Sequence, residues 1–212
     1  MNTSAQSPKP QHVELDERDV DPDPFVQFRR WLDAALAAQQ PEPHAMTVAT
    51  ATRAGKPSAR MVILRGLDER GFVFYTDYDS RKGEELTANP LASLVFYWAA
   101  QSRQVRVEGR VEQVSAEEAD AYFESRPAGS RLAAWVFPQS QVIDGREALE
   151  QRMRELEQQY GPRGAPRPPR WGGYRIVPDV VEFWQGRASR LHDRLRYTRQ
   201  SDGSWLIERL AP

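Results

Sequence analysis

The feature that most constrains the fold is a succession of short apolar segments separated by tight turns, without a regular alternation of strands and helices. Stretches rich in β-branched and aromatic residues predict strands at 46–50, 59–67, 72–76, 91–98, 104–114, 173–177, 180–184, 195–199 and 205–210. In the segment 104–114, apolar residues alternate with charged ones, so one face should be buried and the other polar. This order favours a mainly β, antiparallel barrel with peripheral helices (α+β) over a doubly wound parallel sheet.

Helices are predicted from their caps. Asp23 is expected to cap a helix whose first residue is Pro24, a position that requires no N–H. Further helices are predicted to begin at Ser80, at the capping-box sequence 115–118 and at 144–147, the last continuing to about residue 160. The Pro/Arg/Gly-rich segment 161–170 is expected to be a linker without core residues.

Composition narrows the class of protein. With 212 residues, the chain should form a polar, mobile arm over 1–22 and one domain over 23–212. Its 29 basic and 30 acidic side chains, without a long basic block, argue against a nucleic-acid partner. No apolar run is long enough for a membrane span, and the N-terminus lacks a secretion pattern, so a cytoplasmic protein is expected. The lack of cysteine and the three histidines argue against a metal site.

Any bound phosphate must be held by side chains. Neither a Gly-x-Gly-x-x-Gly segment after a strand nor a phosphate-loop lysine motif, which would bind it through the backbone, occurs in the sequence. A mononucleotide could be held by Arg60 at a strand start, Thr76 at a strand end, and Arg81 and Lys82 at the start of a short helix. For an Arg-Lys pair taken alone, a solvated helix face is the favoured reading, and Arg60 shifts the balance toward a site.

A second group of polar residues points to another anion. Tyr122 and Arg126 are four residues apart and share a helical face, which Ser130 continues if the turn persists past Pro127. Their phenol, guanidinium and hydroxyl would suit a substrate phosphate. A helix that simply ends in an exposed Ser-Arg-Pro sequence is an equally good reading.

The last third of the chain carries a third group. Arg190, His192 and Arg194 alternate, so an extended segment would place all three on one face, where their charges require an anionic ligand. Trp184, on a predicted strand, is more typical of a core than of a ligand contact. The loop residues Gln139 and Ser140 could reach a ligand across a subunit boundary. Together the groups indicate a phosphorylated aromatic cofactor and a phosphorylated substrate.

These groups, in this order, resemble the pyridoxine (pyridoxamine) 5'-phosphate oxidase family of flavin-dependent enzymes. The resemblance extends from about residue 24 to 212. It is carried by the segments 60–65, 74–76, 80–83, 103–105, 122–127, 139–140, 171–175, 182–186, 190–192 and 209–212. It implies a split β-barrel homodimer with two flavin mononucleotides (FMN) at the subunit interface.

The resemblance also implies roles for individual residues. FMN would contact Arg60, Met61, Val62, Ile63, Leu64, Arg65, Tyr75, Thr76, Arg81, Lys82 and Gln104 from one subunit, and Gln139, Ser140, Trp184 and Arg194, largely from the other. The substrate would contact Arg65, Tyr122, Arg126, Ser130, Arg190, Leu191 and His192. Of these, Arg190 and His192 would be the catalytic residues, lying over the pyridine ring near the carbon that is oxidised.

The implied reaction is hydride transfer from C4' of pyridoxine or pyridoxamine 5'-phosphate to flavin N5, giving pyridoxal 5'-phosphate. Dioxygen then reoxidises the flavin and hydrogen peroxide is released. Two departures from the family concern the substrate: Arg65 stands where the family usually has Lys, and 13–18 lacks the Arg-x-Glu-Tyr-like segment that closes over substrate in many members.

Two other functions remain open from the sequence. One keeps the fold and the flavin but oxidises another aromatic ring, as in the related phenazine-pathway oxidases. The other is a non-catalytic flavin- or pyridoxal-phosphate-binding protein. Tyr122, Arg126 and Ser130 argue against the first, because an unphosphorylated ring has no use for three phosphate donors, and Arg190 with His192 argues against the second.

Overall fold

The structure, a computed structural model, describes residues 14–212. Its contacts divide the chain into two compact units. Of the described residues, the terminal unit contains 14–47, 93–108 and 178–212, and the central unit contains 48–92 and 109–177. Residues 1–13 of the predicted arm lie outside the described residues. The mobile arm and the single domain therefore stay predictions.

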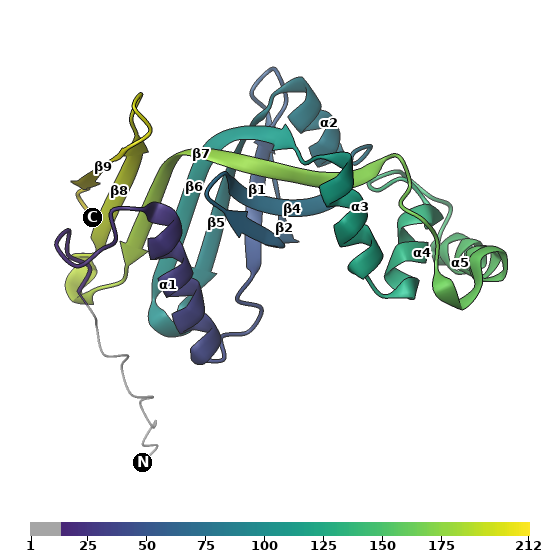
Figure 1. Ribbon diagram of the computed structural model, residues 1–212, viewed down its shortest axis with the longest axis horizontal. Coiled ribbons are helices and arrows are strands. Elements are labelled where there is room, and N and C mark those ends of the chain that lie inside the picture. The colour runs from purple at the N-terminus through teal and green to yellow at the C-terminus, as the bar shows by residue number, and fades with distance from the viewer. Residues whose placement is uncertain (1–13) are drawn as a thin grey trace, which may run out of the picture. The chain divides into compact units, whose positions relative to one another are not determined.

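The described residues form nine strands. They are β1 (Ala45–Ala51), β2 (Pro57–Ile63), β3 (Gly66–Asp68), β4 (Gly71–Asp77), β5 (Leu91–Trp98), β6 (Arg103–Gln113), β7 (Trp171–Gln185), β8 (Asp193–Arg199) and β9 (Trp205–Arg209). The sheet order is β2-β1-β5-β6-β7-β4-β3, with β8 beside β7 and β9 beside β8 (Figure 1). The pairs β3–β4, β4–β7, β7–β8 and β8–β9 are antiparallel, as predicted.

Two predicted strand boundaries differ in the structure. The single strand expected over 59–67 is divided, because β2 ends at Ile63 and β3 begins at Gly66. The strands expected over 173–177 and 180–184 are instead one strand, β7, which contains Pro178. Proline has no N–H to donate, but β7 pairs with β4 up to Ile176 and with β8 from Val180, so Pro178 falls between these two ladders.

The described residues form five helices, of which the one over 128–136 was not predicted and the other four begin at or beside the predicted starts. They are α1 (Pro24–Ala37), α2 (Arg81–Ala88), α3 (Ala116–Ser125), α4 (Ala128–Val136) and α5 (Arg146–Tyr160), with short 3-10 turns at Ala99–Gln101, Gly161–Arg163 and Ala188–Arg190. The Asp23 carboxylate accepts from the Phe25 N–H at 2.8 Å, and Ser80 Oγ accepts from the Gly83 N–H at 3.3 Å. Both caps satisfy a backbone donor that has no intrahelical partner.

In the central unit, two glycines of β7 make room for tyrosine rings. A Cβ on Gly172 would lie 2.1 Å from the Tyr78 hydroxyl oxygen, and one on Gly173 would lie 2.8 Å from a ring carbon of Tyr75. In the β4–β7 register, Tyr75 is paired with Gly173 and Thr76 with Gly172. The missing side chains therefore allow both rings to lie directly against the strand.

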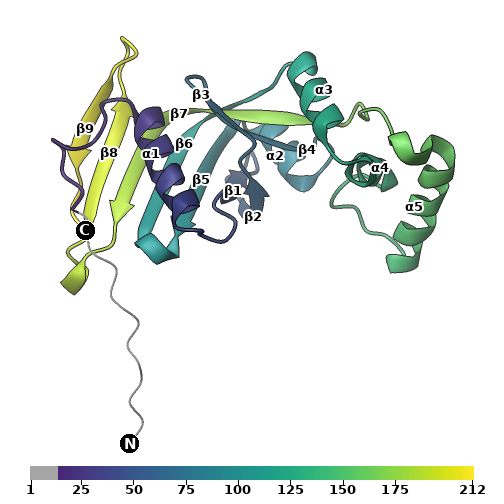
Figure 2. The same cartoon turned by 60° about the horizontal axis from the view of Figure 1, so that its bottom comes forward.

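A small helical hairpin completes the central unit. Figure 2 shows α4 and α5 side by side, and Leu132 of α4 and Leu156 of α5 are both buried. Ala165 is buried with them, at 1% exposure, and the Trp135 Nε1–H donates to the Pro166 carbonyl at 2.7 Å. The prediction that 161–170 lacks core residues is therefore wrong. The segment packs against the hairpin, with Ala165 in the same buried cluster as Leu132 and Leu156.

In the terminal unit, aromatic residues of α1 pack on the sheet. Phe28 lies 4.8 Å from Phe96 of β5, and Trp31 lies 5.2 Å from Phe183 of β7, measured between ring centroids. These edge contacts are the favoured geometry for buried aromatic pairs and hold α1 in place.

Residues 14–17 lie against β8 and β9 of the same unit. Leu15 is buried, its N–H donates to Asp193 at 3.3 Å, and Arg209 donates to its carbonyl at 2.9 Å. Arg209 also forms an ion pair with Glu17 at 2.7 Å. This contact set joins the described start of the chain to its last two strands.

Candidate active site

A cavity of ≈ 790 Å³ lies within the central unit. Many of the residues predicted to bind ligands line it: Arg60, Met61, Val62, Ile63, Arg65, Tyr75, Thr76, Arg81, Lys82, Tyr122, Arg126, Gln139 and Ser140. Its charged lining consists of the cations Arg60, Arg65, Arg81, Lys82 and Arg126 and the single anion Asp77. Such an excess of positive charge in a concave site favours an anionic ligand.

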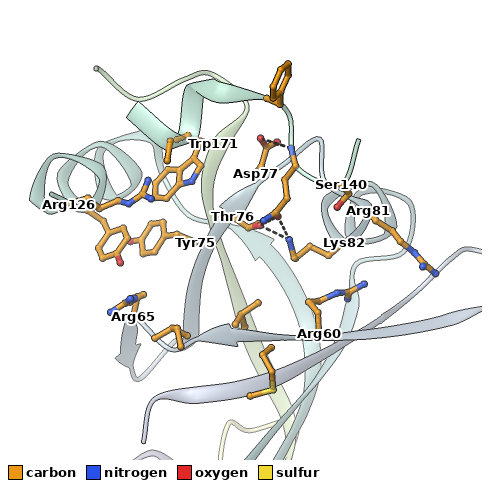
Figure 3. Close-up of a pocket in the computed structure, with 18 of the residues that line it drawn as sticks. Arg60, Arg65, Tyr75, Thr76, Asp77, Arg81, Lys82, Arg126, Ser140 and Trp171 are labelled. Carbon is orange, nitrogen blue, oxygen red and sulfur yellow. Dashed lines mark hydrogen bonds between the residues drawn. The ribbon is translucent and has the colours of Figure 1, made fainter. Parts of the chain in front are cut away.

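Lys82 provides the most buried cation of the cavity. Its Nζ donates to Thr76 Oγ1 at 2.8 Å (Figure 3) and to Gln139 Oε1 at 2.5 Å, and also to Ser80 Oγ at 3.1 Å. Burial, together with the charge of Arg60, lowers the pKa of Lys82 from 10.5 to about 8. An anion in the cavity would stabilise the charged form and oppose this shift.

Arg60 reaches the same region from β2. Its Nη1 donates to Thr50 Oγ1 at 2.6 Å, and its Nη2 donates to Ser58 Oγ at 2.5 Å. Arg81, at the first turn of α2, is exposed and also lines the cavity. Figure 3 shows Arg60, Arg81 and Lys82 grouped on one side of the cavity. We call this set, with Thr76, the phosphate-donor cluster.

Gln139 is held at this cluster by residues that the sequence analysis did not identify. Its N–H donates to Asp77 Oδ2 at 3.3 Å, and Arg170 donates to the same oxygen at 2.9 Å. Arg170 also donates to the Ala134 carbonyl at 2.6 Å, which ties the loop to α4. The resemblance implies that Gln139, Ser140, Trp184 and Arg194 complete the site largely from the other subunit; within the single chain, Gln139 and Ser140 line this cavity. Asp77 directly follows Thr76 at the end of β4, and this position next to a predicted site residue could have identified Asp77 as part of the site.

The other side of the cavity is aromatic. The Tyr75 ring stacks on Tyr122 with centroids 3.9 Å apart and planes 12° apart, and on Trp171 with centroids 5.5 Å apart. Burial, with the nearby charge of Glu118, raises the pKa of Tyr75 to about 12, so its phenol stays neutral. Trp171 belongs to a segment that supports the family resemblance, although no ligand role was predicted for it.

Arg126 lies over this aromatic stack. Its guanidinium carbon is 4.6 Å from the centre of a Trp171 ring, a cation–π contact. Its Nη1 is buried and has no hydrogen-bond partner among the described residues. Burial lowers the pKa of Arg126, since desolvation disfavours its charged form. Figure 3 shows Arg126 and the stack on the opposite side of the cavity from the phosphate-donor cluster, and we call them the aromatic end.

The helical face expected through Tyr122, Arg126 and Ser130 is interrupted. α3 ends at Ser125, Arg126 has an extended backbone with ψ 147°, and α4 begins at Ala128 after Pro127. The residue before a proline is driven out of the α region, which explains the break. Tyr122 and Arg126 still line the cavity, whereas Ser130 and the buried Leu64 are not among its lining residues.

The remaining predicted site residues belong to the terminal unit. They are Gln104 on β6, Trp184 on β7, Arg190 and Leu191 after it, His192, and Arg194 on β8. Arg190 and Leu191 are exposed, and Gln104 is half-exposed. The Trp184 and His192 rings lie 4.7 Å apart, and Arg194 donates to Glu182 at 2.8 Å.

The extended segment expected over 190–194 begins only at Asp193. Ser189 and Arg190 have positive φ angles of 57° and 62° in the 3-10 turn Ala188–Arg190, so simple alternation does not place Arg190. His192 Nδ1 instead accepts from the Arg187 N–H at 3.1 Å. This hydrogen bond leaves Nε2 as the protonated nitrogen of a neutral imidazole.

Residues 14–212 lack two features typical of other kinds of function. They contain no group of three or more His, Cys, Asp or Glu arranged to hold a metal ion. No helix in this part of the chain is both long enough and apolar enough to cross a membrane.

Comparison with known proteins defines the class. Residues 32–160 match the family described as "Pyridoxamine 5'-phosphate oxidase", and residues 171–212 match the "Pyridoxine 5'-phosphate oxidase C-terminal dimerisation region". Relatives from Nostoc sp. and Paraburkholderia phymatum, both named pyridoxine/pyridoxamine 5'-phosphate oxidase, are each 61% identical over 93% of this chain; the match covers 92% and 93% of their own lengths.

Solved structures agree with the fold. PhzG from Burkholderia lata, in complex with tetrahydrophenazine-1-carboxylic acid, has a TM-score of 0.89 and 35% identity, covering 94% of this chain and 98% of that one. A pyridoxamine 5'-phosphate oxidase-related, FMN-binding protein from Nostoc punctiforme has a TM-score of 0.70 and 21% identity, covering 87% and 97%.

The fold and the cavity define a split-barrel oxidoreductase with a cationic, aromatic-lined pocket. The chain belongs to the pyridoxamine 5'-phosphate oxidase family.

Proposed function

We propose that this enzyme is an FMN-dependent oxidase that converts pyridoxine 5'-phosphate and pyridoxamine 5'-phosphate into pyridoxal 5'-phosphate. The observation that carries the proposal is the buried, unpartnered Nη1 of Arg126 beside an aromatic stack, on the opposite side of the cavity from Lys82 and Arg60. Two separated sets of cationic donors fit two phosphorylated ligands. The names of the relatives support the same substrates.

The phosphate-donor cluster fits the phosphate of FMN. Lys82 and Thr76 are buried, and a phosphate dianion requires several charge-assisted donors when it leaves water. The first turn of α2 adds backbone N–H groups and the positive end of its dipole. The chemistry that bound FMN supplies is the acceptance of a hydride from substrate and the passage of two electrons to dioxygen, which gives hydrogen peroxide.

The aromatic end fits the phosphate of the substrate. Arg126 would donate its unpartnered Nη1, and Tyr122, whose ring lies in the stack, would add a phenol. Arg65 and Ser130 are proposed to assist, although Ser130 is not among the lining residues. Since Tyr75 remains neutral, it can donate a hydrogen bond without opposing a bound dianion.

We further propose that the enzyme is a homodimer in which terminal-unit residues complete the site. The match of residues 171–212 to a dimerisation region supports this arrangement. Gln104, Trp184 and Arg194 would contact FMN, and Arg190 and His192 would lie over the substrate ring. The hydrogen bond from the Arg187 N–H would fix the His192 ring so that Nε2–H faces the ligand.

A second candidate is the oxidation of a phenazine precursor. It is favoured by the similarity to PhzG, whose structure contains tetrahydrophenazine-1-carboxylic acid. A carboxylate could also pair with Arg126, so the fold alone does not separate the two reactions. The higher identity to relatives named for the phosphorylated vitamers supports the first proposal.

The test is a turnover assay with FMN-loaded protein, in which hydrogen peroxide and pyridoxal 5'-phosphate are measured. We expect both phosphorylated vitamers to be oxidised, with unphosphorylated pyridoxine as the matched control that lacks the anion for Arg126. Equal turnover of pyridoxine and its phosphate would contradict the role of Arg126. Turnover of tetrahydrophenazine-1-carboxylic acid alone would establish the second candidate instead.

A further inference from the structure

Glu85 is a buried carboxylate directly behind the cavity wall. It lies one turn after Arg81 on α2, is 5% exposed, and is not itself a lining residue. A buried carboxylate is strongly unfavourable unless charges and hydrogen bonds compensate it. The hydrogen-bond and ion-pair partners of Glu85 therefore identify the side chains that this carboxylate positions.

Each oxygen of Glu85 accepts from a different part of the wall. Oε1 accepts from Arg81 Nε at 3.0 Å. Oε2 accepts from Ser58 Oγ at 2.5 Å and from Thr50 Oγ1, and lies 3.4 Å from Arg60 Nη2. The carboxylate thus joins α2 to β1 and β2.

The same hydroxyls also bind Arg60. Thr50 Oγ1 accepts from Arg60 Nη1, and Ser58 Oγ accepts from Arg60 Nη2. The Glu85 carboxylate therefore holds Arg60 in two ways. It contacts the guanidinium directly, and it accepts hydrogen bonds from the two hydroxyls that in turn accept from Arg60. A guanidinium in such a closed network cannot rotate away without breaking several bonds at once.

Charge gives the network a second role. Arg60, Arg81 and Lys82 line one side of the cavity, and Glu85 is the acidic group that contacts two of them. Although burial raises the pKa of Glu85, hydrogen bonds from Ser58, Thr50 and Arg81 lower it to about 2. The carboxylate is therefore charged throughout the neutral range and reduces repulsion among the cations before a ligand arrives.

We infer that Glu85 is a positioning residue, which holds Arg60 and Arg81 in place to receive the 5'-phosphate of FMN. The inference rests on the proposed function, because it assigns the phosphate-donor cluster to that phosphate. Glu85 acts only through the two arginines. Its removal should therefore affect ligands that carry the phosphate and spare those that lack it.

The test compares FMN with riboflavin, which has the same ring system but no phosphate. Dissociation constants are measured by flavin fluorescence on the full-length, flavin-free protein for the wild type, for Glu85→Gln and for Glu84→Gln, an exposed neighbour on the same helix. We expect Glu85→Gln to weaken FMN binding by about tenfold, the scale of a lost charge-assisted contact, with riboflavin binding changed by less than about twofold. Glu84→Gln should bind both flavins as the wild type does.

The outcomes separate the inference from the proposed function. Parallel weakening of FMN and riboflavin, or unchanged FMN binding, would overturn the role of Glu85. A wild type that binds neither flavin would overturn the proposed function, and this role with it. If Glu85→Gln does not fold, Thr50→Val removes a hydroxyl shared by Glu85 and Arg60, and a selective loss of FMN affinity is again expected.

Discussion

The two ends of the cavity differ in how far their donors are already satisfied. At the phosphate-donor cluster, Lys82 contacts the oxygens of Thr76, Ser80 and Gln139. At the aromatic end, Arg126 has a buried Nη1 without a hydrogen-bond partner in residues 14–212. At the phosphate-donor cluster, the Lys82 donors already have protein acceptors. At the aromatic end, the Arg126 Nη1 donor has none among the described residues and can serve a ligand.

This difference predicts different consequences of mutation. A cation that has protein acceptors exchanges them for the ligand, so the net gain on binding is moderate. A buried donor without an acceptor gains the whole interaction, since no existing hydrogen bond is broken. We therefore expect Arg126 to contribute more to substrate binding than Lys82 contributes to FMN binding.

The largest effect is expected for Arg126→Ala. The loss of a hydrogen bond to a charged group, about 1.5–3 kcal/mol, should raise the KM for pyridoxamine 5'-phosphate roughly 10- to 100-fold. Steady-state kinetics at saturating FMN would measure it, with the exposed Arg154→Ala as the control. Loss of FMN with an unchanged KM would show that the two ends are assigned the wrong way round.

A smaller effect is expected for Lys82→Met, which keeps the length of the buried stem but removes the charge. FMN should bind about tenfold more weakly, and the KM for substrate at saturating FMN should change by less than about twofold. Flavin fluorescence titration measures the first and kinetics the second. Lys56→Met, at an exposed lysine, is the matched control, and a larger loss in that variant would contradict the assignment.

The smallest effect is expected for the pH dependence of FMN binding, which should arise at the phosphate-donor cluster and not at the aromatic end. The pKa of Lys82 is lowered to about 8 by burial and by Arg60. FMN should bind most tightly below pH 8 and more weakly above it, as Lys82 loses its proton. Lys82→Met should lack this decline, whereas the guanidinium of Arg126 does not titrate in the range. An identical profile in wild type and variant would exclude Lys82 as the source.

The same shift predicts the sign of a stability change in flavin-free protein. Between pH 8 and 10.5 the unfolded chain binds the Lys82 proton more strongly than the folded chain does. The free energy of unfolding of the wild type should therefore rise relative to that of Lys82→Met as the pH is raised through this interval. Below pH 8 the buried Lys82 ammonium should destabilise the folded wild type by its full amount. Thermal unfolding of both proteins at several pH values would measure the difference.

Local features of this fold were predictable from sequence, and long-range contacts were not. The caps at Asp23 and Ser80 depend on backbone groups within three residues, so their sequence patterns were sufficient. The contact of Asp77 with Arg170 joins residues 93 positions apart, and nothing in either neighbourhood indicates it. Thr76 near the end of β4 and Arg81 and Lys82 at the start of α2 follow from element ends, whereas Arg60 lies in the middle of β2, which begins at Pro57 and not at the predicted residue 59.

The two errors near the proposed site have physical causes. Arg126 was placed on a continuous helix, but Pro127 imposes an extended backbone on it. Arg190 was placed on an extended segment, but a positive φ angle puts it in a turn. Periodicity assumes that a regular backbone persists, and both residues occur where it stops.

The glycine pair of β7 limits how this pocket can be redesigned. Any side chain at Gly173 would push the Tyr75 ring off the strand and disorder the wall that faces the ligand. Variants selected for bulkier or smaller aromatic compounds should therefore change at Ala133 and Ala134 of α4, which also line the cavity, while β7 keeps its sequence.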